Sequence, residues 1–201
     1  MGDIQELPPP RKRKGPLREL LETLVLAVII AFTVRTFGVE VYRVQGTSME
    51  STLHTGERVL VNKFVYRYLR QPEPGDVIVF RYPRQPDRDF IKRVVAVAGD
   101  RVEIKEGKVS VNGKLFPEAP GVLLSDEDSA KVEIVPPDSV YVLGDNRNNS
   151  EDSRWFGEVP LENIRGPAFL RIWPLGRVCH FVNPVKVAAS ASKDRGFWGC
   201  P

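Results

Sequence analysis

A run of twelve uncharged residues, 23–34, divides this chain into two unlike parts. Extended to residues 17–38, the run has charges only near its ends and approaches the ~20 residues that cross a bilayer as a helix. A basic cluster, Arg11–Lys14, precedes it, and positive charge before a span keeps that end in the cytoplasm. We therefore predict a cytoplasmic basic tail over residues 1–16, a transmembrane anchor over 17–38, and an extracytoplasmic remainder at the cell membrane.

Two other interpretations of residues 17–38 stay open. A cleaved signal peptide would carry a small-x-small pair after its apolar region, but the flank reads Arg35-Thr36-Phe37-Gly38. The other alternative is an amphipathic core helix. The composition, with 42% apolar and 27% charged residues, is ordinary for a globular protein, and a net charge of +3 indicates no particular partner.

After residue 39 the chain is a series of short strand-like runs separated by turns. Alternation and short apolar runs predict strands over residues 76–82, 90–97, 101–105, 109–111, 132–134, 140–143 and 168–173. The pairs Glu106-Gly107 and Asn112-Gly113 are typical of hairpin turns. We therefore predict a mainly antiparallel β domain over residues 39–175, with an exposed excursion at 115–130. Residues 176–201 form a tail to which the sequence assigns no role.

The stretch Gly144–Arg154 contains no apolar side chain. It is either a solvated surface loop or a hydrogen-bonded loop that holds other groups in place, because unpaired buried polar groups cost roughly 1–3 kcal/mol each. A calcium loop does not fit, since Arg147 occupies a ligand position and Ser150 replaces the turn glycine. The spacing of the two cysteines and two histidines (Cys179, Cys200, His54, His180) matches no zinc pattern, so we expect no metal.

Two further segments carry residues capable of catalysis. Ser48 follows Gly46 in a turn-like segment, where a serine can be exposed as a nucleophile. Its base could be His54 or His180, or a lysine whose pKa burial has lowered. In the strand-like run 90–97, Lys92 shares a face with Val94 and Ala96 while Arg93 faces the other way. The alternative for Lys92 is an edge-strand lysine with its ammonium in water.

Together these segments resemble the type I signal peptidases, which are membrane-anchored serine proteases. The matching motifs are Ser48-Met49 with Thr52-Leu53; Arg58–Lys63; Gly75–Phe80; Phe90–Val95 with Gly99-Asp100; and Gly144–Arg147 with Ser150, Asp152, Ser153 and Arg154. They occur in the family's order over residues 17–175. The resemblance implies an antiparallel β-sheet catalytic domain of signal-peptidase type behind a single N-terminal transmembrane helix.

The resemblance also implies roles for individual residues. Ser48 is then the nucleophile, Lys92 the general base, and Ser150 the side chain that orients the lysine. The ion pairs that hold the polar loop are attributed to Asp145, Arg147, Asp152 and Arg154. The chain departs from the family at Gly46, where a serine would contribute to the oxyanion hole, and at Ser51, where proline is common. No cofactor is implied.

The implied substrates are the signal peptides of translocated precursor proteins, cut after Ala-x-Ala sites. The residues that match the family's shallow apolar pockets are Val44, Met49, Leu53, Phe90 and Ile91. The other partner is the lipid bilayer, and neither nucleic acid nor metal is expected. A minor hypothesis is self-cleavage at Ala189-Ser190-Ala191, an Ala-x-Ala sequence in the C-terminal tail.

Two rival functions remain. A self-cleaving repressor protease shares the Ser-Lys chemistry, but that class has an N-terminal DNA-binding domain where this chain has a basic tail and an apolar run. A membrane-tethered β module that only binds would not need Ser48, Lys92 and Ser150 together.

Overall fold

The structure is a computed structural model that describes residues 15–50, 52–119, 122, 131–181 and 183–189. It divides into two units, Met1–Phe37 and Gly38–Pro201, which we describe separately. The basic cluster at 11–14, Ser51, most of the 115–130 excursion, the self-cleavage hypothesis at Ser190 and Cys200 lie outside the described residues.

In the described part of the N-terminal unit, residues 15–37, the chain forms the helix α1 (Pro16–Phe37), of 22 residues. Its large apolar side chains are exposed to solvent from Leu17 to Phe32. Two threonines are accommodated because their hydroxyls donate to carbonyls one turn back, Thr23 to Glu19 and Thr33 to Ile29, both at 2.8 Å. Among the helices of the described residues, none combines the length and the apolar character needed to cross a membrane.

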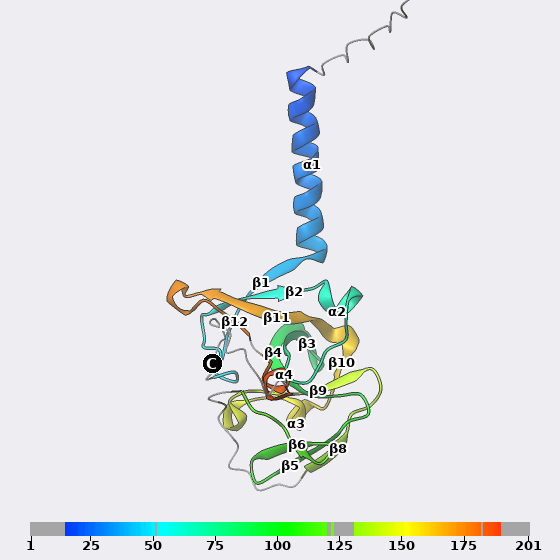
Figure 1. The fold of residues 1–201 in the computed structure, drawn as a ribbon, viewed down its shortest axis with the longest axis vertical. Helices are drawn as coiled ribbons and strands as arrows, with labels where there is room; N and C mark the ends of the chain where they lie inside the picture. Colours follow the sequence, from blue (N-terminus) through cyan, green and yellow to red (C-terminus); the bar gives the residue numbers. More distant parts are fainter. Residues whose placement is uncertain (1–14, 51, 120–121, 123–130, 182, 190–201) are drawn as a thin grey trace, which may run out of the picture. The chain divides into compact units, whose positions relative to one another are not determined.

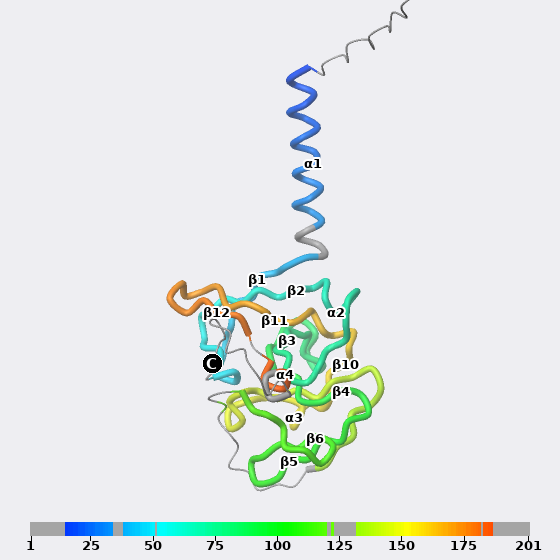
Figure 2. The backbone as a smooth tube through the Cα atoms, viewed as in Figure 1, coloured from blue at the N-terminus to red at the C-terminus, as the bar shows by residue number. Residues whose placement is uncertain are grey.

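The second unit is built on two antiparallel sheets (Figure 1). The larger has eight strands in the order β1-β2-β11-β3-β4-β9-β10, with β12 paired to β11. Its strands are β1 (Val39–Arg43), β2 (Arg58–Asn62), β3 (Val77–Tyr82), β4 (Gln85–Val97), β9 (Ser139–Leu143), β10 (Val159–Pro160), β11 (Ile164–Trp173) and β12 (Cys179–His180). Strands β2 and β11, far apart in sequence, lie side by side (Figure 2). The predicted mainly antiparallel β fold is confirmed.

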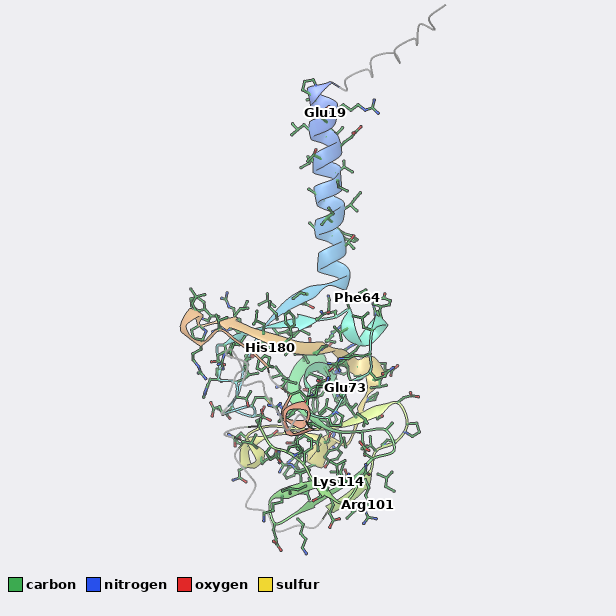
Figure 3. The ribbon with its side chains drawn as sticks, viewed as in Figure 1. Glu19, Phe64, Glu73, Arg101, Lys114 and His180 are labelled. Atoms are coloured by element: carbon green, nitrogen blue, oxygen red, sulfur yellow. The ribbon has the colours of Figure 1, made fainter. Side chains whose placement is uncertain are left out.

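The smaller sheet has four strands in the order β7-β6-β5-β8. They are β5 (Arg101–Lys105), β6 (Lys108–Val111), β7 (Lys114–Leu115) and β8 (Lys131–Ile134). Both predicted hairpin turns are present: φ is positive at Glu106 (50°), Gly107 (69°), Asn112 (53°) and Gly113 (76°). Such two-residue turns match the right-handed twist of the flanking strands. Figure 3 shows Arg101 and Lys114 on this part of the molecule.

Short helices complete the unit: α2 (Val65–Tyr68), α3 (Ser153–Phe156), α4 (Pro184–Ala189), and the single 3₁₀ turns η1 (Arg147–Asn149), η2 (Leu161–Asn163) and η3 (Leu175–Arg177). Within the described residues after 40, none is longer than two turns, as the lack of helical periodicity predicts. Among the described residues, the buried apolar side chains form three clusters, and one of them contains Met49 and Leu53 from the segment that carries Ser48, together with Val59 and Val79.

Two stretches outside the predicted core are more closely packed than the sequence indicates. The expectation that residues 115–130 are exposed is wrong at its start, because Phe116 and Ala119 are buried and Phe116 packs into the core of the small sheet. The chain also continues its contacts past residue 175. Strand β12 pairs with β11, and the Asn183 amide donates to Asp76 Oδ1 at 3.1 Å.

Candidate active site

The loop between β1 and β2, residues 44–57, carries Ser48 and is called the serine loop below. Gly46 has φ +88°, a left-handed conformation that glycine adopts without steric cost. Met49 and Leu53 belong to this loop, and their side chains are fully buried in the core. The Leu53 N–H donates to the Met49 carbonyl at 2.7 Å. These two apolar anchors leave Ser48 half-buried at the surface of the domain.

Lys92 lies on β4, 44 residues from Ser48 in sequence. Its Nζ is 2.8 Å from Ser48 Oγ and 3.1 Å from the Ile91 carbonyl oxygen. The side chain is 4% exposed, and Nζ lies 5.1 Å from the centre of the Phe90 ring. The alternative of a solvated edge-strand lysine is therefore wrong: the amine is enclosed next to a hydroxyl.

Burial controls the charge of this amine. It lowers the pKa of Lys92 from 10.5 to about 8, because the ammonium loses its hydration inside the protein. The carboxylates of Asp152, Glu151 and Asp145 act in the opposite direction, but more weakly. A lysine of this kind is neutral in a useful fraction of molecules near physiological pH, whereas an exposed lysine is not.

The polar block Gly144–Arg154 lies against the serine loop. The Asn146 N–H donates to the Ser48 carbonyl at 3.0 Å, and the Asn146 amide donates to the Thr47 carbonyl at 3.2 Å. A Cβ built on Gly144 would overlap both the Ser48 carbonyl oxygen and the Ser150 hydroxyl. The close approach of the two backbones therefore requires glycine at this position.

A buried ion pair joins the polar block to β4. Arg93 donates from Nε and Nη2 to the two carboxylate oxygens of Asp145, at 2.8 and 2.7 Å. The hydroxyl of Thr52 donates to the same carboxylate at 2.5 Å. Burial by itself would raise the pKa of Asp145, but the Arg93 guanidinium and the hydrogen bonds hold it below its ordinary value. Asp145 is thus an anion fixed between the two segments.

Arg147, Asp152 and Arg154, the other residues predicted to hold the polar block, form two more ion pairs. Arg154 binds Asp152 at 2.8 Å, and Asp152 Oδ2 also accepts the Gly144 N–H at 3.1 Å. Arg147 binds Glu118 at 2.5 Å, and the Arg147 carbonyl accepts from Arg154 Nη2 at 2.5 Å. These contacts fold the block upon itself and tie it to the segment that follows β7.

Ser150, predicted to orient the lysine, is buried, and its hydroxyl has no hydrogen-bond partner among the described residues. It lies against Gly144, close to the serine loop. Its role toward Lys92 stays a prediction.

Sequence reasoning missed three polar partners of the site. Alternation places Arg93 on the opposite face of the strand from Lys92, but it does not predict that the Asp145 carboxylate is its partner. In the sequence Thr52 is only one residue of the motif around Ser48, and Glu118 lies within the stretch 115–130 that is expected to be exposed. Their shared signal is weak: each is a polar residue beside an apolar run, and its partner is distant in sequence.

An open groove of about 340 Å³ runs past Ser48 and Lys92. The predicted pocket residues Val44, Phe90 and Ile91 line it. Met49 and Leu53 instead belong to the core beneath. Polar residues also line the groove, among them Arg43, Gln45, Arg88, Asp89 and Glu151. The groove lies beside β1, the edge strand of the large sheet, so backbone groups of an extended peptide can pair there.

The histidines lie elsewhere. His54 contacts Glu50, with Nδ1 3.7 Å from Oε1, and His180 lies on β12 (Figure 3) with its Nδ1 3.0 Å from the Phe181 carbonyl oxygen. Within the described part of the chain, no group of three or more His, Cys, Asp and Glu side chains could hold a metal ion. Cys179 is buried and disulfide-bonded.

Comparison with known proteins identifies the family of this chain. Residues 17–173 match the family described as signal peptidase, peptidase S26. The chain is 42% identical over 165 residues to the probable signal peptidase I-2 of Synechocystis, covering 80% of this chain and 75% of that one. It is 34% identical over 181 residues to signal peptidase I P of Bacillus subtilis subsp. natto, covering 85% and 96%. A crystal structure of a signal peptidase I from Enterococcus faecalis aligns with a TM-score of 0.43 and 27% identity over 49% of this chain and 97% of that one. With a family match over most of its length and relatives of this identity, the chain belongs to the signal peptidase family, peptidase S26.

Proposed function

We propose that this protein is a membrane-associated serine endopeptidase that removes N-terminal signal peptides from exported precursor proteins, with Ser48 as nucleophile and Lys92 as general base. The observation that carries the proposal is the 2.8 Å separation of Lys92 Nζ and Ser48 Oγ in a buried setting. A serine hydroxyl is a weak nucleophile until a base within hydrogen-bond distance accepts its proton.

The proposed reaction begins with neutral Lys92. Its Nζ takes the proton from Ser48 Oγ as that oxygen attacks the scissile carbonyl carbon. The resulting ammonium then donates the proton to the leaving amine, which releases the mature protein and leaves an ester on Ser48. Lys92, neutral again, removes a proton from water as the water oxygen attacks the ester carbonyl. The Lys92 ammonium then returns that proton to Ser48 Oγ as the ester bond breaks, which frees the signal peptide and restores both residues.

Stabilisation of the tetrahedral oxyanion is attributed to the backbone N–H of Ser48. Donors aimed at the position of developing charge contribute typically a few kcal/mol to catalysis. Gly46 offers no hydroxyl for this purpose. Asp145, Arg147, Asp152 and Arg154 act as the supporting ion pairs that hold the polar block against the serine loop. Ser150 is assigned to orient the lysine, although its hydroxyl makes no hydrogen bond to Lys92 in the structure.

The groove supports a substrate bound as an extended strand. Main-chain hydrogen bonds to a sheet edge give affinity without regard to sequence, while shallow pockets select alternate side chains. We attribute the choice of small residues at the first and third positions before the cut to Val44, Phe90 and Ile91, which line the groove, with Met49 and Leu53 supporting it from beneath.

We further propose that α1 holds the enzyme at the cell membrane, with the N-terminus cytoplasmic and the β domain on the extracytoplasmic side. The row of exposed apolar side chains along α1 supports this, because such a surface is costly in water. The test is fractionation of the full chain and of a chain that starts at Gly38. If the full chain remains in the aqueous fraction after vesicles are sedimented, membrane association is refuted.

The catalytic proposal is tested with a precursor peptide that carries an Ala-x-Ala site. Ser48→Ala and Lys92→Met should each reduce cleavage by at least about 10³-fold while the domain stays folded. Lys63→Met is the matched control: Lys63 pairs with Glu40 at 3.3 Å and is 27% exposed, so its loss should leave cleavage unchanged. Retained cleavage by Lys92→Met would refute the dyad.

A further inference from the structure

A second buried ion pair lies at the end of the serine loop. Arg171, on β11, has its Nη1 3.2 Å from Glu57 Oε2, and the two side chains are only 3% and 4% exposed. Arg177 Nη1 lies 2.9 Å from the other carboxylate oxygen of Glu57. Glu57 is the last loop residue before β2.

Each member of this pair also binds the backbone of the serine loop. Arg171 Nη1 donates to the Thr52 carbonyl at 2.9 Å, and Glu57 Oε2 accepts the His54 N–H at 3.0 Å. The Glu57 backbone closes the base of the loop, since its carbonyl accepts the Val44 N–H at 2.8 Å. The two side chains therefore fix the loop backbone at two points, Thr52 and His54, and the backbone bond closes its base.

Thr52 connects this pair to the general base. Its carbonyl is held by Arg171, and its hydroxyl is held by Asp145, whose carboxylate in turn binds Arg93. Arg93 is the strand neighbour of Lys92 on β4. Two buried ion pairs, Arg93 with Asp145 and Arg171 with Glu57, thus converge on Thr52, four positions after Ser48.

Stability alone does not explain a buried pair of this kind. Desolvation of two ions often costs as much as their attraction returns, so well-packed apolar residues of similar volume frequently stabilise a fold as well or better. A guanidinium and a carboxylate differ from apolar residues in directionality: the planar fork fixes the groups it binds in distance and angle. This directionality matters where a loop residue such as Ser48 must stay at a fixed distance from a side chain on another element, here Lys92.

We propose that Arg171 and Glu57 are positioning residues, which hold Thr52 and thereby keep Ser48 Oγ within hydrogen-bond distance of Lys92 Nζ. Neither touches the reacting atoms. The inference rests on the proposed function, because positioning of Ser48 matters only if it is the nucleophile. A misplacement of about 1 Å can cost on the order of 10² in rate, so a loosened loop should reduce turnover.

The test uses the full chain in detergent and an Ala-x-Ala precursor peptide. Arg171→Met removes the charge and all donors, and should lower kcat about 10²-fold with KM changed less than about twofold. Arg171→Lys keeps the charge, but one ammonium cannot reproduce the guanidinium contacts, in which Nη1 reaches Glu57 and Thr52 while Nε donates to the Arg177 carbonyl at 2.8 Å. It should recover part of the loss, to within about tenfold of wild type.

The pH dependence distinguishes positioning from general destabilisation. A loosened loop admits water to Lys92 and weakens the desolvation that lowers its pKa to about 8, so the acid limb of the rate profile should move to higher pH in both variants. Arg70→Met is the control: it breaks the 2.6 Å pair with Asp76, which is also partly buried, and should change neither kcat nor the acid limb.

Each outcome decides the proposal. It is overturned if folded Arg171→Lys and Arg171→Met have the kcat and acid limb of wild type, if only KM rises, or if Arg70→Met loses as much activity. If Arg171→Met does not fold, Arg171→Lys alone decides by the same criteria. Ser48→Ala is assayed in parallel: activity retained by that variant would refute the proposed function itself, whereas its loss together with normal Arg171 variants would refute only the positioning role.

Discussion

The buried amine of Lys92 leads to a prediction about folding stability as well as catalysis. Its pKa falls from 10.5 to about 8 on burial. One pKa unit corresponds to about 1.4 kcal/mol, so while Lys92 is charged it lowers the free energy of unfolding by about 3 kcal/mol. Lys92→Met keeps most of the side-chain volume and removes the charge, and should therefore be more stable than wild type at pH 7.

The sign of the pH dependence follows from the direction of the pKa change. Because the folded pKa lies below the unfolded value, the folded protein binds this proton more weakly than the unfolded chain does. The cost is fully present below about pH 8, shrinks between about pH 8 and 10.5, and vanishes above that range. The stability advantage of Lys92→Met over wild type should therefore fall by about 2 kcal/mol between about pH 7 and pH 10.

The measurement is urea unfolding of both proteins at several pH values, followed by tryptophan fluorescence. Comparing the two proteins at each pH cancels the titration of groups that they share. An advantage that stays constant from about pH 7 to pH 10 would refute the reasoning, because it would mean that Lys92 has the same pKa in the folded and unfolded chains. The same pKa also sets the rate: cleavage by wild type at pH 7 should be about a tenth of its alkaline plateau.

Two further predictions concern the polar block. Asp145→Asn leaves the buried Arg93 guanidinium without a counter-charge, so the free energy of unfolding should fall by about 3–5 kcal/mol. Urea unfolding measures this loss, and a loss below about 1 kcal/mol would contradict a buried pair. Gly144→Ala introduces a Cβ that overlaps the Ser150 hydroxyl and the Ser48 carbonyl, and should lower peptide cleavage at least about tenfold. Gly176→Ala, where a Cβ meets nothing within 4 Å, is its control, and equal activity of the two variants would refute the close-approach argument.

Most strands could be predicted because their signals are local. Alternation over residues 101–105 corresponds to β5 residue for residue, and the two hairpin turns lie where Asn-Gly and Glu-Gly pairs occur. Strands β4 and β11 are longer than predicted. Their extra residues include polar side chains and a proline, such as Asp89, which pairs with Arg81, and Pro167, which pairs with Ile78. Local sequence patterns do not predict these pairs, because they depend on the partner strand.

The candidate site was predictable in its residue types but not in its connections. The motifs around Ser48 and Lys92 indicated a nucleophile and a base, and strand alternation indicated that one of two adjacent charges faces an apolar surface. Both Lys92 and Arg93 proved to be buried. Alternation assigns a side chain to a face, but it does not say which segment covers that face or which anion that segment supplies.

The sequence by itself determined the antiparallel β class, the hairpin turns, and the presence of a serine, a lysine and a polar block with the order typical of one protease family. These follow from local backbone preferences and from residue identity. Only the tertiary structure decided that Lys92 Nζ reaches Ser48 Oγ across 44 residues, and that Arg171 reaches Glu57 across 114. The physical reason is that burial and pairing depend on what the folded chain places opposite each side chain: the same lysine is an ordinary cation in water, and its pKa falls only when the fold excludes water from it.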